Sequence, residues 1–245
     1  MSAHAAGSPG SVLVTLATYN ESENLPDLVQ AILEVHPEAN VLVIDDNSPD
    51  GTGKIADSLS ASDSRIHVLH RAGKLGLGTA TIAGMRYALE HHYQFMLNMD
   101  ADFSHHPRYV PALLAGMAEH DVMIGSRYVP GGGVPDWPRK RRFMSWCVNS
   151  YARLMLGVRA RDTSGAFRCY RVESLRRLDL DQVISRGYSF QEEMLFRCQR
   201  AGCRIGETPI IFEDRRRGSS KINGAEAFSA IGIICWLGIG RLLGR

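Results

Sequence analysis

The 245-residue sequence has few cysteines and little excess of positive over negative charge, and both features restrict the class of protein that the chain can be. Its five cysteines form no Cys-x-x-Cys pair and are too few for a disulfide scaffold, so a reducing, cytosol-facing location fits best. The formal net charge is only +2, whereas a general nucleic-acid binder normally carries a dominant basic field. We therefore expect no nucleic-acid partner, and any basic function must be local.

The sequence also lacks two nucleotide-binding signatures and a long apolar run. No G-x-G-x-x-G follows the first apolar segment, which disfavours a dehydrogenase, and the glycine-rich stretch 73–78 lacks the spacing of a P-loop. That stretch is either a flexible turn before a helix or a place where backbone approaches a ligand. The uncharged stretch 227–240 is too short to cross a hydrocarbon core of roughly 30 Å at about 1.5 Å per residue.

Strand-like and helix-like segments alternate along the first half of the chain. Short apolar runs predict strands at 12–16, 41–44, 66–69, 95–97 and 122–124. Apolar residues at helical spacing predict helices at 25–32, 54–59, 79–90 and 110–117. Strand, helix, strand implies parallel pairing with a right-handed crossover. The sequence therefore predicts an α/β fold, a Rossmann-like and mostly parallel sheet with flanking helices and a ligand crevice at the strand ends.

Acidic side chains follow three of these predicted strands. They are Glu21, the pair Asp45 and Asp46, and Asp100 with Asp102. An Asp-x-Asp pair at a strand end can share one divalent cation, and its hard oxygens suit Mg²⁺ or Mn²⁺, which in turn suit a diphosphate. A lone Asp-x-Asp is also common in solvated turns, but recurrence at three strand ends favours a ligand crevice.

The second half of the chain carries basic and apolar segments that leave several interpretations open. Residues 139–142 are four consecutive cations before an amphipathic stretch, which indicates either a helix on an anionic membrane surface or a solvated charge run. A basic loop at 214–221 could close over a diphosphate. Glu192 and Glu193 at a helix start complement its dipole without requiring a catalytic role. The tail 227–240 is an interfacial helix, a docking helix for a membrane partner or a buried core helix.

Together these segments resemble the polyprenol (dolichol) phosphate mannose synthases, within the family 2 glycosyltransferases of GT-A fold. The similarity runs from Leu16 to the tail and includes TYNE, VIDDNSPDGTG, GKLGLGTA, MDADFSHHP, GSRY, SGAFRCYR, GYSFQEEM and DRRRGSSK. The combination is highly specific, although each piece alone is not. The resemblance implies transfer of mannose from GDP-mannose to a polyprenyl or dolichyl monophosphate by a metal-dependent inverting displacement.

The resemblance also implies a set of site residues. Those that would bind the nucleotide sugar are Ala17, Tyr19, Glu21, Ile44, Asp46, Asp100, Ala101, Asp102, Arg127, Arg215 and Lys221. Those that would hold Mg²⁺ or Mn²⁺ are Asp100, Asp102 and Ser104. Arg141 and Ser145 would receive the acceptor phosphate, and the reaction itself would depend most on Asp102, Arg127, Arg215 and Lys221. Ala17 stands where the family usually has proline, and Ser104 where relatives have glutamine or serine.

Composition and the same resemblance together predict how the chain is organised and where it acts. Residues 1–10 would be a disordered lead-in, residues 11–224 the GT-A catalytic domain, and residues 225–245 an apolar helix associated with a membrane. We expect a location on the cytoplasmic face of a membrane, either peripheral or anchored by the tail. The sequence leaves open whether separate small membrane subunits are required.

Two other functions remain open at this point. The chain could be a family 2 transferase that uses another nucleotide sugar or a non-lipid acceptor. It could also be a non-catalytic module that binds a nucleotide sugar without turnover, although the Asp100 and Asp102 pair with the 214–221 loop disfavours this.

Overall fold

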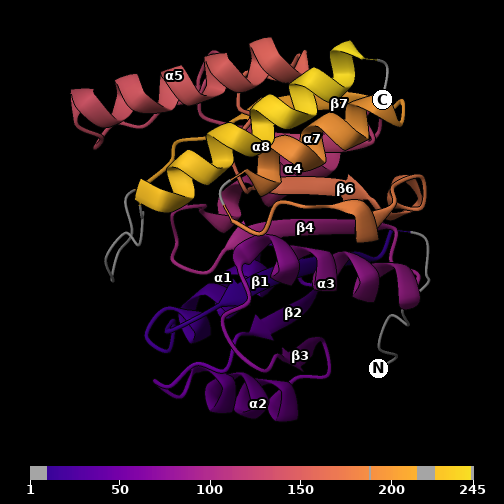
Figure 1. Ribbon diagram of the computed structural model, residues 1–245. Helices are drawn as coiled ribbons and strands as arrows, with labels where there is room; N and C mark the ends of the chain where they lie inside the picture. Colours follow the sequence, from indigo (N-terminus) through magenta and orange to yellow (C-terminus); the bar gives the residue numbers. More distant parts are fainter. Residues whose placement is uncertain (1–9, 188, 214–223, 244–245) are drawn as a thin grey trace.

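The described residues, 10–187, 189–213 and 224–243 of a computed structural model, build one mixed sheet with helices on both faces. The order of its seven strands is β3-β2-β1-β4-β6-β5-β7, which puts β4 at the centre (Figure 1). The strands are β1 Val12–Thr18, β2 Asn40–Asp45, β3 Ile66–His70, β4 Phe95–Asp100, β5 Val122–Ser126, β6 Arg168–Arg171 and β7 Ile205–Pro209. The mostly parallel α/β sheet predicted from the sequence is confirmed, with β6 as its antiparallel member.

Helices alternate with the strands through β5 and dominate the rest of the chain. They are α1 Leu25–Val35, α2 Thr52–Ser62, α3 Leu77–Glu90, α4 Val110–Gly116, α5 Arg139–Leu156, α6 Val172–Leu175, α7 Phe190–Arg200 and α8 Gly224–Leu242. Short 3₁₀ turns lie at Pro107–Tyr109 and Leu180–Gln182.

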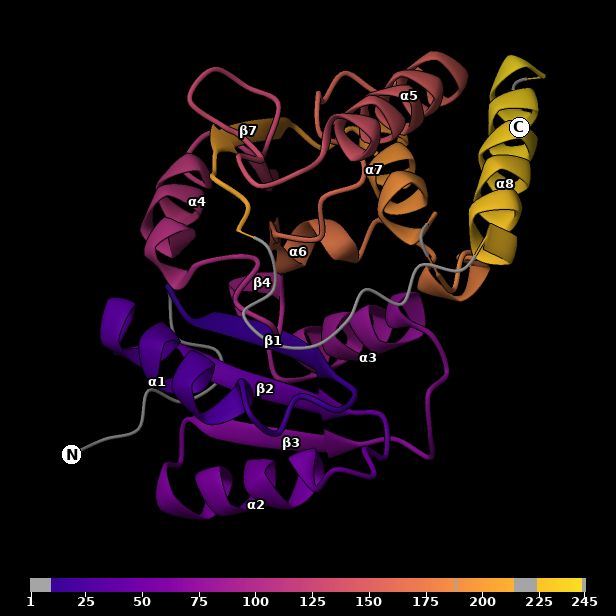
Figure 2. The same cartoon turned by 90° about the vertical axis from the view of Figure 1, so that its left-hand side faces the viewer.

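The sheet is buried on both faces because its strands carry apolar side chains at successive positions. One core contains Leu13, Met96 and Ile124 and is covered by α3 and α5 to α8. The other contains Val14 and Leu97 and is covered by α1, α2 and α4. Figure 2 shows α1 and α4 on one side of the sheet and α3 and α7 on the other. The sheet is therefore a rigid platform whose strand ends can hold a site.

Strands β6 and β7 are the two strands that the sequence analysis did not predict. β6 has only four residues, too few to show a period, and the first of them is an arginine. Arg168 is fully buried, and its guanidinium donates hydrogen bonds to the backbone carbonyls of Gly165 (2.8 Å), Gln191 (2.7 Å) and Thr163 (2.6 Å). These three bonds compensate the buried charge and tie β6 to α7.

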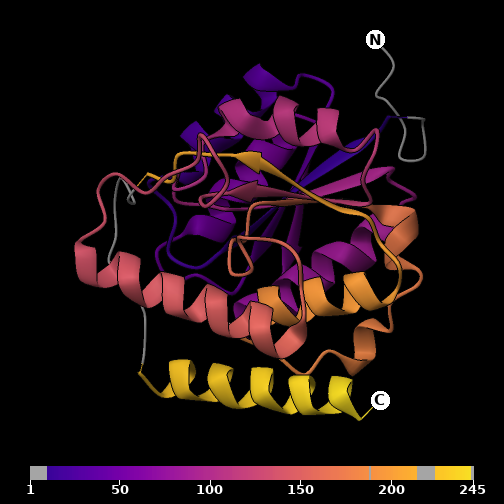
Figure 3. The ribbon, with the colours of Figure 1, turned by 90° about the horizontal axis from the view of Figure 1, so that it is seen from above.

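Helix α8 lies outside α5 and α7, on the side away from the sheet (Figure 3). Its Ile234 and Leu237 are buried in the core, whereas Trp236 and Leu242 are exposed. In the described ranges, no helix combines the length and the apolar character that a membrane crossing requires. The tail is thus neither wholly a core helix nor wholly exposed.

A glycine in the first turn of α3 allows α7 to approach closely. A Cβ atom on Gly78 would lie 2.6 Å from Cδ2 of Phe190 and 2.8 Å from the carbonyl oxygen of Ser185. We expect Gly78→Ala to lower the free energy of unfolding by about 1–3 kcal/mol, as overpacking does. Gly232→Ala is the control, because nothing lies within 4 Å of that Cβ and alanine favours a helix. Equal stability of both variants in denaturant unfolding would contradict this packing.

Candidate active site

The register of the central strands brings the predicted site residues to one edge of the sheet. Ala17 of β1 pairs with Ile44 of β2 on one side and with Asp100 of β4 on the other. Thr18 lies opposite Asp45 in the next step of the same ladder. This edge is on the left in Figure 1 and faces the viewer in Figure 2. The prediction that acidic groups after separate strands share one edge is confirmed.

A tight turn follows β4 and gathers polar atoms around the second aspartate. Phe103 has a positive φ of 63°, which reverses the chain, and the Ser104 N–H donates to Oδ1 of Asp102 at 3.0 Å. The Ser104 hydroxyl is buried and has no hydrogen-bond partner within the described part of the chain. A buried hydroxyl without a partner is unusual, and such an atom is suited to contact a bound ion or water. Asp100, Asp102 and Ser104 therefore fit a small oxygen-liganded cation such as Mg²⁺ or Mn²⁺.

His105 follows this turn and remains uncharged. The Asp100 N–H donates to Nδ1 of His105 at 3.3 Å, and the ring is stacked on Phe167 at 5.1 Å between centroids. Burial lowers the pKa of His105, although the Asp100 and Asp102 carboxylates oppose this. Over the described ranges, no cluster of three or more His, Cys, Asp and Glu side chains could hold a metal.

The loop after β1 is hydrogen-bonded to the loop after β2. The Glu21 N–H donates to Oγ1 of Thr52 at 3.0 Å, and Oε2 of Glu21 accepts from the side chain of Asn24 at 2.8 Å. Nζ of Lys74 lies 5.1 Å from the ring centroid of Tyr19, within cation–π distance. Tyr19 and Glu21, both predicted to contact the nucleotide, are thus held beside the glycine-rich stretch that contains Lys74.

The two adjacent aspartates after β2 have different environments. Asp45 accepts hydrogen bonds from the hydroxyls of Thr18 (3.1 Å) and Ser48 (2.5 Å) and so shapes the loop. Asp46 is buried, and its Oδ1 lies 3.0 Å from Nη1 of Arg71, although outside hydrogen-bonding geometry. Burial raises the pKa of Asp46, and the attraction of Arg71 only partly offsets this. Asp46, which the resemblance assigns to the base pocket, is thus paired with Arg71, whereas Asp45 holds the loop.

Arg127, which follows β5, forms a buried ion pair. Its Nε and Nη2 donate to the two carboxylate oxygens of Asp162 at 2.7 and 2.6 Å, and its own N–H donates to Oδ2 at 3.0 Å. The side chains are 9% and 0% exposed. Burial disfavours the charge of Arg127, but Asp162 outweighs this and raises its pKa above the ordinary range. Arg127 was predicted to contact phosphate, and the structure shows a guanidinium already held by a carboxylate that the sequence analysis did not single out.

The first turn of α7 presents buried polar atoms to this cluster. Both side-chain polar atoms of Gln191 and Oε2 of Glu192 are buried without hydrogen-bond partners among the residues described. Burial raises the pKa of Glu192 to about 7. Glu193 instead accepts the N–H groups of Ile184 (3.2 Å) and Ser185 (2.8 Å) and holds that loop. The sequence predicted only a dipole role for both glutamates, and no spacing signal separates the two.

Helix α5 begins at Arg139, so the four consecutive cations form its first turn, where they oppose the helix dipole. The guanidinium carbon of Arg141 lies 3.9 Å from the ring centroid of Trp137, and Oγ of Ser145 lies 2.6 Å from the Tyr128 hydroxyl. The predicted acceptor residues are thus fixed by aromatic neighbours. Next to them is a hollow of 520 Å³, whose lining includes Arg127, Tyr128, Val134, Arg142 and Trp146. The sequence analysis missed Tyr128 and Trp146 as site residues.

Two of the predicted residues, Arg215 and Lys221, lie outside the described residues. Glu213, just before them, donates its N–H to the carbonyl of Ser104 at 3.3 Å. Ala101 is buried in the turn after β4. All other predicted site residues lie at or near the edge formed by β1, β2, β4 and β5. A mixed sheet of this order, with a carboxylate pair at the end of its central strand, has the GT-A glycosyltransferase fold.

Comparisons with known proteins agree with this class. The model of glycosyl transferase family 2 matches residues 13–179. An undecaprenyl-phosphate mannosyltransferase of Micrococcus luteus is 47% identical over 220 residues, 90% of this chain and 90% of that protein. A polyprenol monophosphomannose synthase of Mycolicibacterium smegmatis is 44% identical over 233 residues, 94% of this chain and 88% of that protein.

A solved structure gives the same fold. Glucosyl-3-phosphoglycerate synthase from Mycobacterium tuberculosis, in complex with Mn²⁺, UDP and glucosyl-3-phosphoglycerate, has a TM-score of 0.63 at 17% identity, covering 96% of this chain and 79% of that one. The chain belongs to glycosyl transferase family 2, as the resemblance implied, and is an enzyme of that family.

Breaking the buried pair of Arg127 and Asp162 should be costly to stability. Asp162→Asn leaves a buried guanidinium without its counter-charge, so we expect the free energy of unfolding to fall by about 3–5 kcal/mol. Asp63→Asn is the control, because its Arg65 partner is at the surface and such pairs contribute at most about 1 kcal/mol. Denaturant unfolding measures both. A loss in Asp162→Asn no larger than in the control would contradict the account.

The raised pKa of Glu192 should make stability depend on pH. A carboxyl whose pKa rises from 4.5 to about 7 on folding stabilises the protein in its protonated form, and this contribution is lost as pH rises through 7. In Glu192→Gln the side chain is neutral at every pH. The free energy of unfolding of wild type should therefore fall by on the order of 3 kcal/mol relative to this variant between pH 4.5 and values above 7. Parallel pH profiles for the two proteins would show that Glu192 ionises normally.

Proposed function

We propose that this chain transfers mannose from GDP-mannose to a polyprenyl monophosphate. One observation supports this most directly: the Asp100 and Asp102 pair, with the buried Ser104 hydroxyl, lies at the same sheet edge as a hollow lined by Arg142 and Trp146 of α5. The first feature suits a diphosphate with its cation, and the second suits an anionic head with an apolar chain. The names of the two relatives that are 47% and 44% identical support the same donor sugar and acceptor class.

The donor would lie across the ends of β1, β2 and β4. Tyr19 and Glu21 would hold the base and ribose end, Ile44 and Asp46 would complete the base pocket, and Ala17 and Ala101 would line it by their backbone. Gln191 is an additional candidate for the sugar, because its buried amide has no partner in the described protein and lies beside Glu192. Guanine and mannose selectivity would then come from a few side chains on rigid strand ends.

The residues at the turn after β4 favour a divalent cation. Among the described residues, Asp100 and Asp102 follow β4 directly, and the guanidinium of Arg127 is paired with Asp162. Asp100, Asp102 and Ser104 would hold Mg²⁺ or Mn²⁺, and a bound cation supplies positive charge that stabilises the diphosphate as it leaves. Arg215 and Lys221 would add to that neutralisation.

The acceptor would approach from α5, with its phosphate near Arg141 and Ser145. A phosphate monoester has its second pKa near about 6 and is largely dianionic at neutral pH, so its oxygen needs no base to become a nucleophile. This oxygen attacks the anomeric carbon, the bond to GDP breaks on the opposite face, and the configuration inverts. The work of the protein is to position two anions and to balance their charge. Arg127 would contribute positive potential while Asp162 holds it in place.

The same acceptor suggests a membrane surface, at its cytoplasmic face. Helix α5 exposes four large apolar side chains: Phe143, Met144, Trp146 and Leu154. They follow the four cations of its first turn, and this combination is typical of helices that lie in a membrane interface. The chain would bind there peripherally or through α8, alone or with separate membrane subunits.

The direct test is transfer of labelled mannose from GDP-mannose into an organic-extractable product, with a short polyprenyl phosphate and Mg²⁺ or Mn²⁺. Wild type should label the lipid phase. Asp102→Ala should abolish turnover, because one proposed ligand of the cation is lost, and its unfolding transition checks that the fold is retained. Activity of Asp102→Ala with saturating metal would refute the metal site.

Controls separate the alternatives. Asp63→Asn should transfer as wild type does, since its pair lies at the surface. Label that stays in the aqueous phase would indicate a non-lipid acceptor, and transfer from another nucleotide sugar only would replace mannose as the donor. Binding of GDP-mannose without any turnover, with membranes present, would favour the non-catalytic module.

A further inference from the structure

A groove of 560 Å³ lies between α7, α8 and residues 177–182, away from the carboxylate edge. Its lining includes Arg177, Phe196, Arg200, Trp236, Ile239 and Leu243. Helix α7 begins at Phe190, beside Gly78 in the first turn of α3, and ends at Arg200, roughly 16 Å further along at the usual rise per residue. The groove at the far end of α7 is therefore separate from the proposed donor and acceptor sites.

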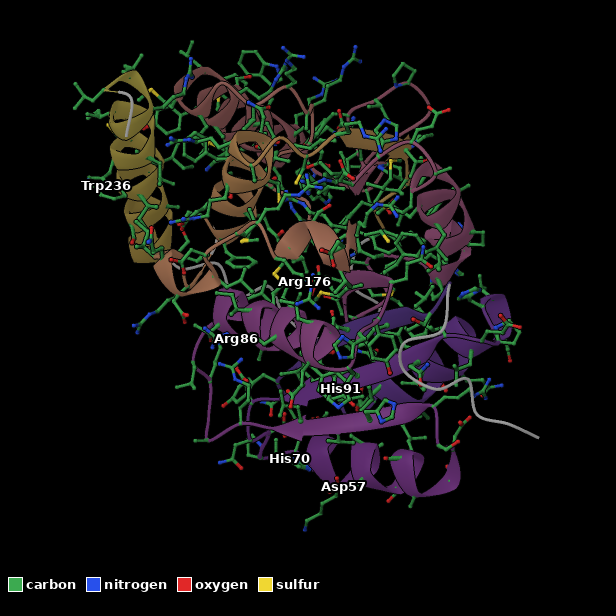
Figure 4. All side chains as sticks on the ribbon, turned by 90° about the vertical axis from the view of Figure 1, so that its right-hand side faces the viewer. Asp57, His70, Arg86, His91, Arg176 and Trp236 are labelled. Atoms are coloured by element: carbon green, nitrogen blue, oxygen red, sulfur yellow. The ribbon has the colours of Figure 1, made fainter. Side chains whose placement is uncertain are left out.

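One wall of this groove is an exposed apolar stripe on α8. Trp236, Ile239 and Leu243 follow each other at helical spacing and are 63%, 49% and 66% exposed. They flank the side of α8 that buries Ile234 and Leu237, so the packing of α8 on the protein does not cover them. Figure 4 shows Trp236 on α8. A contiguous apolar surface of this kind marks an interaction site.

The other wall is cationic. Arg177 and Arg200 are exposed, and the guanidinium carbon of Arg200 lies 5.6 Å from the ring centroid of Phe196. Arg197 also lines the groove but is held by Glu193 at 2.7 Å. The lining contains one carboxylate, Asp179. Positive charge therefore exceeds negative charge beside an apolar stripe.

We propose that this groove binds an anionic phospholipid of the bilayer. The phosphate would lie against Arg177 and Arg200, and an acyl chain would run along Trp236, Ile239 and Leu243. The charge favours an anion, and the apolar wall favours an attached hydrocarbon chain over a free phosphate ion. The proposal rests on the proposed function in one respect, since a lipid acceptor brings the enzyme to a membrane. The bound lipid would fix the far end of α7 and α8 at the surface while the catalytic edge receives the acceptor.

The test compares vesicle binding of Arg177→Glu/Arg200→Glu with wild type. The vesicles are phosphatidylcholine alone or mixed with phosphatidylglycerol. Wild type should prefer the anionic vesicles, and the double variant should lose at least about tenfold in binding to them while binding neutral vesicles as before. The matched control is Arg86→Glu/Arg176→Glu, two exposed arginines outside the groove lining, which should keep the preference (Figure 4).

Four results would overturn the proposal. The first is an undiminished anionic preference in the double variant. The second is loss of that preference in Arg139→Glu/Arg142→Glu alone, which would place the site on α5. Loss of vesicle binding on addition of inorganic phosphate, at a concentration equal to that of the lipid phosphate, would show that the groove binds free phosphate. Lipid-independent dimers that Trp236→Ala dissociates, in analytical ultracentrifugation, would show that a second copy covers the stripe. Mannose transfer to a short water-soluble acceptor should be unchanged in the Arg177→Glu/Arg200→Glu variant. If wild type fails to transfer mannose but still prefers anionic vesicles, only the proposed function is refuted.

Discussion

The buried ion pair between Arg127 and Asp162 is the interaction on which the site depends. It joins the end of β5 to the loop before β6, where Gly165 donates its N–H to Oδ1 of Asp162 at 2.9 Å. Arg168 then connects the same loop to the first turn of α7. Such pairs contribute modestly when intact but are costly to break, because a charge is left buried alone. The acceptor side and the α7 side of the site are therefore positioned by one connected set of charges.

Two described arginines near the end of β4 are held by other groups. Arg127 is paired with Asp162, and Arg168 donates its hydrogen bonds to backbone carbonyls. His105 is buried, and burial lowers the pKa of its imidazole. Two carboxylates that follow one strand, beside a buried hydroxyl, suit a hard cation, and a cation in turn attracts a diphosphate. The chemistry proposed for this edge follows from that grouping of oxygen atoms.

Much of this could be predicted from the sequence, because periodic apolar runs fix strands and helices while strand ends fix an edge. The strands that end near Asp45 and Asp100 are an instance, as is the Asp100 and Asp102 pair. Other features depend on tertiary contacts that leave no local pattern. Asp162 is 35 residues from Arg127 in the sequence, and only the fold brings the two side chains together. Strand β6 is stabilised by the hydrogen bonds that Arg168 donates to backbone carbonyls. Glu192 and Glu193 are adjacent in sequence, but only the fold shows that the carboxylate of Glu193 accepts hydrogen bonds from the loop before α7.

The measurement that tests the central claim most directly is calorimetric titration of GDP into wild type and Asp102→Asn, with and without Mn²⁺. Asparagine keeps the size of the side chain and removes its charge. The account predicts that Mn²⁺ tightens GDP binding to wild type and has little effect on the variant. Equal GDP affinity of wild type with and without the metal, or an undiminished metal effect in Asp102→Asn, would contradict a cation site at the end of β4.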